Sequence, residues 1–136
     1  DVHGDRHPEL LEVEELFNGA TEALAQHMQK EELLLFPYIQ RLVKAQGNAV
    51  KPSPVGFDSL EKYIAETMQT EHETEGERFI TIAALTNNYT PPADGCRTYL
   101  VTLAMLSEFE QDLHHHIHLE NNILFPKAVQ MEKTFL

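Results

Sequence analysis

The segment HMQKEELLLFP at residues 27–37 has a near copy in HIHLENNILFP at residues 116–126, at a constant offset of 89 residues. In each copy a histidine is followed four residues later by a glutamate and then by Leu-Phe-Pro. The pairs are His27 with Glu31 and His116 with Glu120. One His-x-x-x-Glu on a helix is usually an exposed pair. Two copies with the same Leu-Phe-Pro ending, both in register with an apolar helix pattern, instead favour a metal site.

The residues around these copies predict helices. Apolar residues recur at steps of three and four over residues 8–46, 58–85 and 96–133, the pattern of helices with one buried face. Asp58 with Glu61 has the form of a capping box at the start of the second helix. No alternating strand pattern occurs, so the sequence predicts an all-α protein.

Two prolines and the chain start bear on the architecture. Pro37 and Pro126 are expected to kink the first and third helices, because proline removes a backbone donor. Three long helices with short connections predict an up-and-down antiparallel bundle, which usually closes with four helices. The sequence begins without methionine and without a fourth helix, so we expect the first helix of the bundle to be missing from this single domain of residues 1–136.

Composition excludes several classes of protein. A formal net charge of −12 argues against nucleic-acid binding, because phosphates would be repelled. No apolar run reaches the roughly 20 residues that span a bilayer. The single cysteine, Cys96, excludes an internal disulfide and favours a reducing, cytoplasmic location.

Each predicted helix becomes polar on its inward face near its middle. The repeated His-Glu pairs fill gaps in the apolar stripes of the first and third helices, and His72 with Glu75 fills the gap between Met68 and Phe79 in the second. A buried ionised carboxylate needs a cation, and no lysine or arginine lies on these stripes at that level. Imidazole and carboxylate together suit iron, manganese or zinc, so we expect metal ions with bridging carboxylates.

Other candidate ligands carry weaker signals. Glu75 is expected to contact the ligands or to turn to solvent rather than to bind metal. His114, His115 and His118 lie off the stripe of His116 and are expected to be exposed or to contact the ligands. His3 precedes the first predicted helix, and a loop could fold it over the site.

Five segments together resemble a known family: VHGDRHPEL, HMQKEELLLFP, TEHETEGE, TNNYTPP and HIHLENNILFP. In this order they are similar to the hemerythrin-like domain of the iron–sulfur cluster repair di-iron proteins, and the similarity covers essentially the whole chain. The resemblance implies a four-helix bundle holding two non-haem iron ions bridged by an oxo group and carboxylates. It also implies iron binding by His3, His27, Glu31, His72, His116 and Glu120. A further family histidine on the first helix and a small cysteine-bearing domain are absent here.

The resemblance also implies a function. It is the repair of iron–sulfur proteins damaged by nitric oxide or oxidants, through iron donation or nitric oxide chemistry, and a chain lacking its first helix could pair with a second copy. The alternative is an oxygen or nitric oxide carrier or sensor like true hemerythrins. Those place a second histidine four residues after the one matching His72, where this sequence has Gly76. A ferritin-like oxidase is disfavoured because no Glu-x-x-His pair occurs, and a purely structural helical module leaves the buried carboxylates unexplained.

Overall fold

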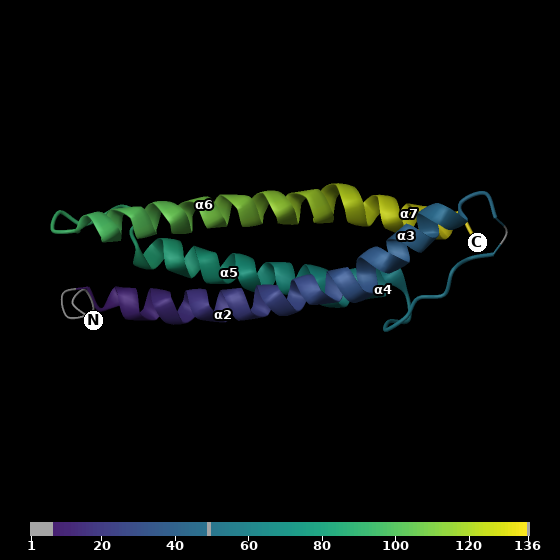
Figure 1. Cartoon of the computed structure of the whole chain (residues 1–136), viewed down its shortest axis with the longest axis horizontal. Helices are drawn as coiled ribbons and strands as arrows, with labels where there is room; N and C mark the ends of the chain where they lie inside the picture. Colours follow the sequence, from purple (N-terminus) through teal and green to yellow (C-terminus); the bar gives the residue numbers. More distant parts are fainter. Residues whose placement is uncertain (1–6, 49, 136) are drawn as a thin grey trace. The chain divides into compact units, whose positions relative to one another are not determined.

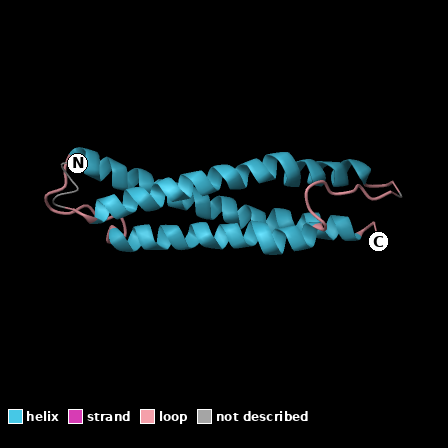
Figure 2. Ribbon diagram, turned by 90° about the horizontal axis from the view of Figure 1, so that it is seen from below, coloured by secondary structure: helices cyan, strands magenta, loops and turns pink. Residues whose placement is uncertain are grey.

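Three helical stretches make up the regular structure of residues 7–48 and 50–135, the residues that the computed structural model describes (Figure 1). The first stretch comprises α2 (Glu9–Lys30), the π-helical segment η1 (Glu31–Leu35) and α3 (Phe36–Ala45). The second comprises α4 (Leu60–Tyr63), η2 (Ile64–Met68) and α5 (Gln69–Leu85), and the third α6 (Arg97–Leu119), η3 (Glu120–Leu124) and α7 (Phe125–Lys133). No strand occurs within these described ranges (Figure 2), so the all-α prediction is confirmed.

The second stretch begins one residue later than the sequence predicts. Ser59, with an extended backbone at φ −141° and ψ 146°, is the N-cap, and its hydroxyl accepts a hydrogen bond from the Lys62 amide at 3.1 Å. The predicted capping box of Asp58 with Glu61 is therefore wrong. The residue three positions after the true cap is a lysine, which cannot return a hydrogen bond to the cap amide as a glutamate would.

Ser59→Ala is expected to lower the free energy of unfolding by about 1 kcal/mol, because the first turn of α4 loses its side-chain acceptor. Urea unfolding followed by circular dichroism measures the change. Ser53→Ala, in the preceding loop, is the matched control. Equal stability of the two variants would contradict the capping role.

Each helical stretch contains one π-helical segment of five residues. In η1 the amide of Phe36 donates to the carbonyl of Glu31, and in η3 the amide of Phe125 donates to the carbonyl of Glu120, five residues back in both cases. A proline without an amide hydrogen follows each of these phenylalanines, which removes the next helical hydrogen bond. The prolines thus lie at local changes of helix type, a kind of irregularity often found at functional sites.

The contacts divide the chain into two compact units, which we describe separately. Unit 1 comprises Asp1–Ala23 and Thr74–His116, and unit 2 comprises Leu24–Glu73 and Ile117–Leu136. The single domain expected for residues 1–136 stays a prediction. None of the described helices combines the length and the apolar character that crossing a membrane requires.

Each unit has its own apolar interior. In unit 1 the rings of Phe17, Phe79 and Phe109 pack together with centroids 5.4–6.4 Å apart. Unit 2 is built around a cluster of fully or almost fully buried side chains from all three stretches: Leu35, Tyr38, Leu42, Leu60, Ile64, Met68, Phe125 and Ala128. This cluster, contributed by residues within and next to the π-helical segments, fixes the positions from which the polar side chains of unit 2 project.

Candidate metal centre

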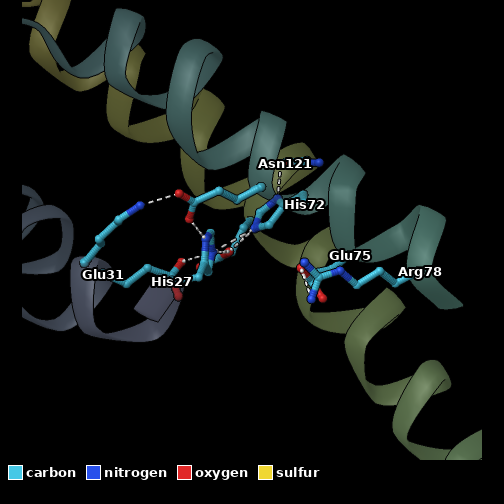
Figure 3. A network of polar contacts seen from close by, with 9 residues as sticks. His27, Glu31, His72, Glu75, Arg78 and Asn121 are labelled. Atoms are coloured by element: carbon cyan, nitrogen blue, oxygen red, sulfur yellow. Dashed lines mark hydrogen bonds and ion pairs between the residues drawn. The ribbon is translucent and has the colours of Figure 1, made fainter. Parts of the chain in front are cut away.

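Four polar side chains converge in the interior of unit 2. His27 at the end of α2, Glu31 at the start of η1, His72 on α5 and Glu120 at the start of η3 are each no more than 5% exposed. One potential ligand atom from each residue lies within 4.8 Å of the others. Figure 3 shows the side chains of His27, Glu31 and His72 turned toward one another. Both repeated Leu-Phe-Pro motifs thus follow a glutamate that belongs to this cluster.

The two imidazole rings present the same nitrogen to the cluster. The Nε2 of His72 lies 2.9 Å from Glu120 Oε1, and the Nε2 of His27 lies 3.6 Å from Glu31 Oε2. The two Nε2 atoms are 3.2 Å apart. The outer nitrogens have other partners, so both rings are oriented with one nitrogen toward the carboxylates.

Two side chains outside the cluster hold the outer nitrogens. The Nδ1 of His27 donates to Glu71 Oε1 at 2.7 Å, since a carboxylate can only accept. The Nδ1 of His72 donates to Asn121 Oδ1 at 2.9 Å (Figure 3). Lys30 donates in turn to the other oxygen of Glu71. Such partners fix the tautomer of a metal-binding histidine and leave the lone pair of Nε2 facing the metal.

Without metal, the cluster balances its charges through a proton on His27. Burial lowers the pKa of His27, but the neighbouring carboxylates of Glu120, Glu31 and Glu71 outweigh burial and raise the pKa to about 10. Burial also raises the pKa of Glu31, with Glu120 nearby acting in the same direction. The pKa of Glu71 is lowered despite burial, because Lys30 and His27 both stabilise its charged form.

The raised pKa of His27 predicts a pH dependence of the metal-free protein. A group whose pKa rises on folding from 6.5 to about 10 stabilises the fold fully below pH 6.5 and loses that contribution as the pH rises through 10. Between pH 7 and pH 10, the free energy of unfolding of chelator-treated protein is expected to fall by more than about 1 kcal/mol. Urea titrations at both pH values measure the free energy of unfolding. The part of its decrease that His27 causes should vanish in His27→Gln.

Glu71→Gln is expected to weaken metal binding roughly 10–100-fold, because His27 loses the carboxylate that orients it. Competition with a chromophoric chelator measures the affinity. Glu73→Gln, two residues along α5 and exposed, is the matched control and should bind metal like the parent chain. Equal affinities in both variants would show that Glu71 does not support His27.

The structure places the remaining predicted site residues as follows. His3 lies outside the described residues. His116 is exposed near the end of α6, in unit 1, and is not one of the four clustered residues. His114, His115 and His118 are exposed, which is one of the two places expected for them. The other was contact with the metal ligands.

Glu75 is buried, with 4% of its surface exposed, so the expectation that it could turn to solvent is wrong. Its Oε2 lies 3.7 Å from Arg78 Nη1, one turn along α5 in unit 1 (Figure 3). The expectation that no basic side chain accompanies the inward-facing acids therefore fails here. Arginine sits three positions after Glu75, a spacing at which helix side chains meet.

Sequence reasoning also missed Glu71, Lys30 and Asn121. Lys30 lies three residues after His27, and Asn121 directly follows Glu120. The three-residue spacing of His27 and Lys30 could have predicted that the two side chains lie near each other on the helix. The contact of Glu71 with His27 joins residues 44 positions apart, which no local pattern reveals.

The four clustered side chains fit a cation. Two imidazoles with inward Nε2 atoms and two buried carboxylates form a nitrogen and oxygen donor set of the kind that binds iron, manganese or zinc. A buried acid can also be stabilised by protein groups alone, without a metal ion. Glu132 in unit 2 accepts a hydrogen bond from the Tyr38 hydroxyl at 2.5 Å and lies 3.8 Å from Lys51 Nζ. The cluster differs from that arrangement because its two acids face histidines, whose nitrogen lone pairs can bind a metal ion once the ring has released its proton.

Comparison with known proteins gives an independent result. Residues 1–128 match the model of the hemerythrin HHE cation binding domain. Among curated relatives, the chain is 37% identical over 129 residues to a probable iron-sulfur cluster repair protein of Haemophilus influenzae, covering 95% of this chain and 52% of the relative. It is 38% identical over 133 residues to the iron-sulfur cluster repair protein YtfE of Yersinia pseudotuberculosis, covering 96% and 53%.

A third relative, the iron-sulfur cluster repair protein YtfE of Musicola paradisiaca, is 43% identical over 109 residues, which cover 80% of this chain and 43% of the relative. The chain thus spans about half the length of the curated relatives it matches. The predicted resemblance is confirmed. With a family model matching residues 1–128, this chain belongs to the hemerythrin HHE cation binding domain family.

Proposed function

We propose that this chain is the iron-binding part of a protein that repairs iron–sulfur clusters damaged by nitrosative or oxidative stress. The observation that carries the proposal is the buried set of His27, Glu31, His72 and Glu120, with both Nε2 atoms facing the two carboxylates. The relatives are named for the process, cluster repair. In this proposal the clients are damaged iron–sulfur proteins in the cytoplasm, and nitric oxide or oxygen is the small ligand.

The centre is proposed to hold two non-haem iron ions. The four clustered residues would provide one shared donor set, with the glutamates between the ions, and His3 and His116 would complete it. Bound iron supplies the redox and ligand-exchange chemistry. The protein's residues orient the donors, exclude water and set the proton count. His27 must lose its Nε2 proton before it can bind metal, so iron uptake releases a proton and weakens as the pH falls.

Two features of the residues favour exchange of iron over permanent retention. Among the described residues, two carboxylates belong to the cluster, so the ligand charge is modest for two ions. Glu71, which orients His27, has 30% of its side chain exposed, and Lys30 has 39% exposed. Solvent can therefore compete for the pair that positions one of the ligands, which provides a route by which the donor set can loosen.

We also propose that the complete domain is a four-helix bundle. Unit 1 has an open groove of about 470 Å³ between α2 and α6. Its apolar lining includes Leu10, Val13, Phe17, Leu103, Leu106 and Phe109. We propose that a fourth helix, from a segment outside residues 1–136, fills this groove. Light scattering distinguishes the alternative, since pairing with a second copy predicts a dimer of the 136-residue chain whose formation depends on concentration.

The decisive experiment is an iron transfer assay. Protein loaded with iron is mixed with a [4Fe–4S] enzyme whose cluster has been degraded by nitric oxide, and cluster recovery is followed by absorbance and by electron paramagnetic resonance. Recovery is expected with the parent chain and not with the Glu31→Gln, Glu120→Gln double variant. The same amount of free iron is the control. If free iron restored the cluster at the same rate, a specific role of the protein in iron transfer would be refuted. If metal analysis found no iron in the protein, the metal centre itself would be refuted.

A further inference from the structure

The Tyr63 hydroxyl is a buried polar group that the proposed function does not use. Tyr63 is the last residue of α4, and its ring stacks on Phe57 with centroids 4.7 Å apart and planes 18° apart. Both rings pack against the apolar cluster of unit 2. Its hydroxyl oxygen is buried and has no hydrogen-bond partner among the described residues. The packing leaves the ring little freedom to swing the hydroxyl into solvent.

The charges that act on this hydroxyl belong to the candidate metal centre. Burial, followed by the negative charges of Glu71 and Glu31, raises the pKa of Tyr63. The phenol therefore keeps its proton at neutral pH and can donate a hydrogen bond. It does not donate to either of these carboxylates in the structure.

Helix geometry puts Tyr63 and Glu71 on the same side of their helical stretch. The two residues are eight positions apart, and the π-helical segment η2 (Ile64–Met68) lies between them. A π-helical turn contains one residue more than an α-helical turn. Eight residues that include this extra one advance the helix by about two turns, as seven residues would in a regular α-helix. Tyr63 therefore lies about two turns from Glu71 on one face.

We propose that Tyr63 donates a hydrogen bond to a small exchangeable anion that completes the coordination of metal at the His27, Glu31, His72 and Glu120 centre. The inference rests on the proposed metal binding. A buried donor that no described acceptor uses, on the helix face that carries Glu71, is suited to a ligand that comes and goes. Tyr63 would thus be a positioning residue for the small ligand and not a metal ligand.

The test uses azide as the anion and compares the parent chain with Tyr63→Phe. Tyr89→Phe is the matched control, because it removes a phenol hydroxyl bonded to Glu110 in unit 1. Iron content is measured first, and azide is then titrated into the iron-loaded proteins by absorbance. Tyr63→Phe is expected to bind the same amount of iron and to bind azide about tenfold more weakly, as for loss of a hydrogen bond to a charged group. Tyr89→Phe is expected to match the parent chain.

A second measurement separates this role from a structural one. In metal-free protein an unpartnered hydroxyl supports nothing, so Tyr63→Phe should melt at the same temperature as the parent chain or higher. Equal azide affinity in Tyr63→Phe, no azide binding by the iron-loaded parent chain, or a clear fall in the metal-free melting temperature would each overturn the inference. The proposed function stands in all three cases if iron is bound. Failure of the parent chain to bind iron would overturn both.

Discussion

Glu120→Gln is expected to remove most of the stabilisation of the protein by metal. Glu120 is 3% exposed, and its Oε1 lies 2.9 Å from the Nε2 of His72 and 3.9 Å from that of His27. It is therefore the carboxylate that contacts both imidazoles of the cluster. Changes to residues that only support ligands already weaken metal binding roughly 10–100-fold, so losing this carboxylate should cost more than about 100-fold.

The readout is the increase in melting temperature on adding iron anaerobically. At a thousandfold excess over the dissociation constant, a ligand stabilises the folded state by about 4 kcal/mol. For a chain of this size, that corresponds to a rise of roughly 10 °C or more. The full increment should be present in the parent chain and in Glu32→Gln, where the residue replaced is exposed. It should fall to less than half in Glu120→Gln and in Glu31→Gln. Because the readout is the difference between the melting temperatures with and without iron, any effect of the substitution on the metal-free melting temperature cancels.

Phe125→Ala is expected to destabilise the protein by about 3–5 kcal/mol, the usual cost of removing a buried aromatic ring. Phe125 is 1% exposed and belongs to the apolar cluster of unit 2. Its ring lies parallel to the His72 ring, with an interplanar angle of 6° and centroids 6.0 Å apart. The substitution therefore leaves a cavity in the core and removes one wall that holds a candidate ligand.

Chemical unfolding measures the first effect and chelator competition the second. Ile123→Ala is the matched control, because Ile123 lies in the neighbouring η3 and is 42% exposed; it should change stability by less than about 0.5 kcal/mol. Should Phe125→Ala unfold at the same denaturant concentration as Ile123→Ala, the packing described for unit 2 would be wrong.

The helices and part of the site could be predicted from the sequence because both follow one periodic pattern. Histidines and glutamates that continue an apolar stripe lie on the same side of the helix as that stripe, and His27, Glu31, His72 and Glu120 are buried with it. The same reasoning placed His116 inward, but it is exposed in the structure. Periodicity assigns a residue to a face of its helix and does not reveal whether another element covers that face.

The repeat itself is less symmetric in space than in sequence. In the first copy Leu35 is completely buried and Phe36 is partly buried, whereas in the second Phe125 is buried and Leu124 is partly buried. Identical residues in the two copies are therefore buried to different extents, because each copy packs against different neighbours. Contacts between distant positions, such as Glu71 with His27, depend on that packing and are invisible to a local pattern.

The π-helical segments are places where a helix can lose one residue without changing the direction in which its later residues point. Leu33, in the middle of η1, is 65% exposed, and its side chain contributes little to the interior. Deleting it would let an ordinary α-helical turn replace the π-helical turn, and Leu35, Tyr38 and Leu42 would keep their places in the core. The same deletion within a regular α-helical turn would instead rotate every later residue by about 100°. The extra residue in each segment therefore makes these positions the ones where a shortening of the chain is best tolerated.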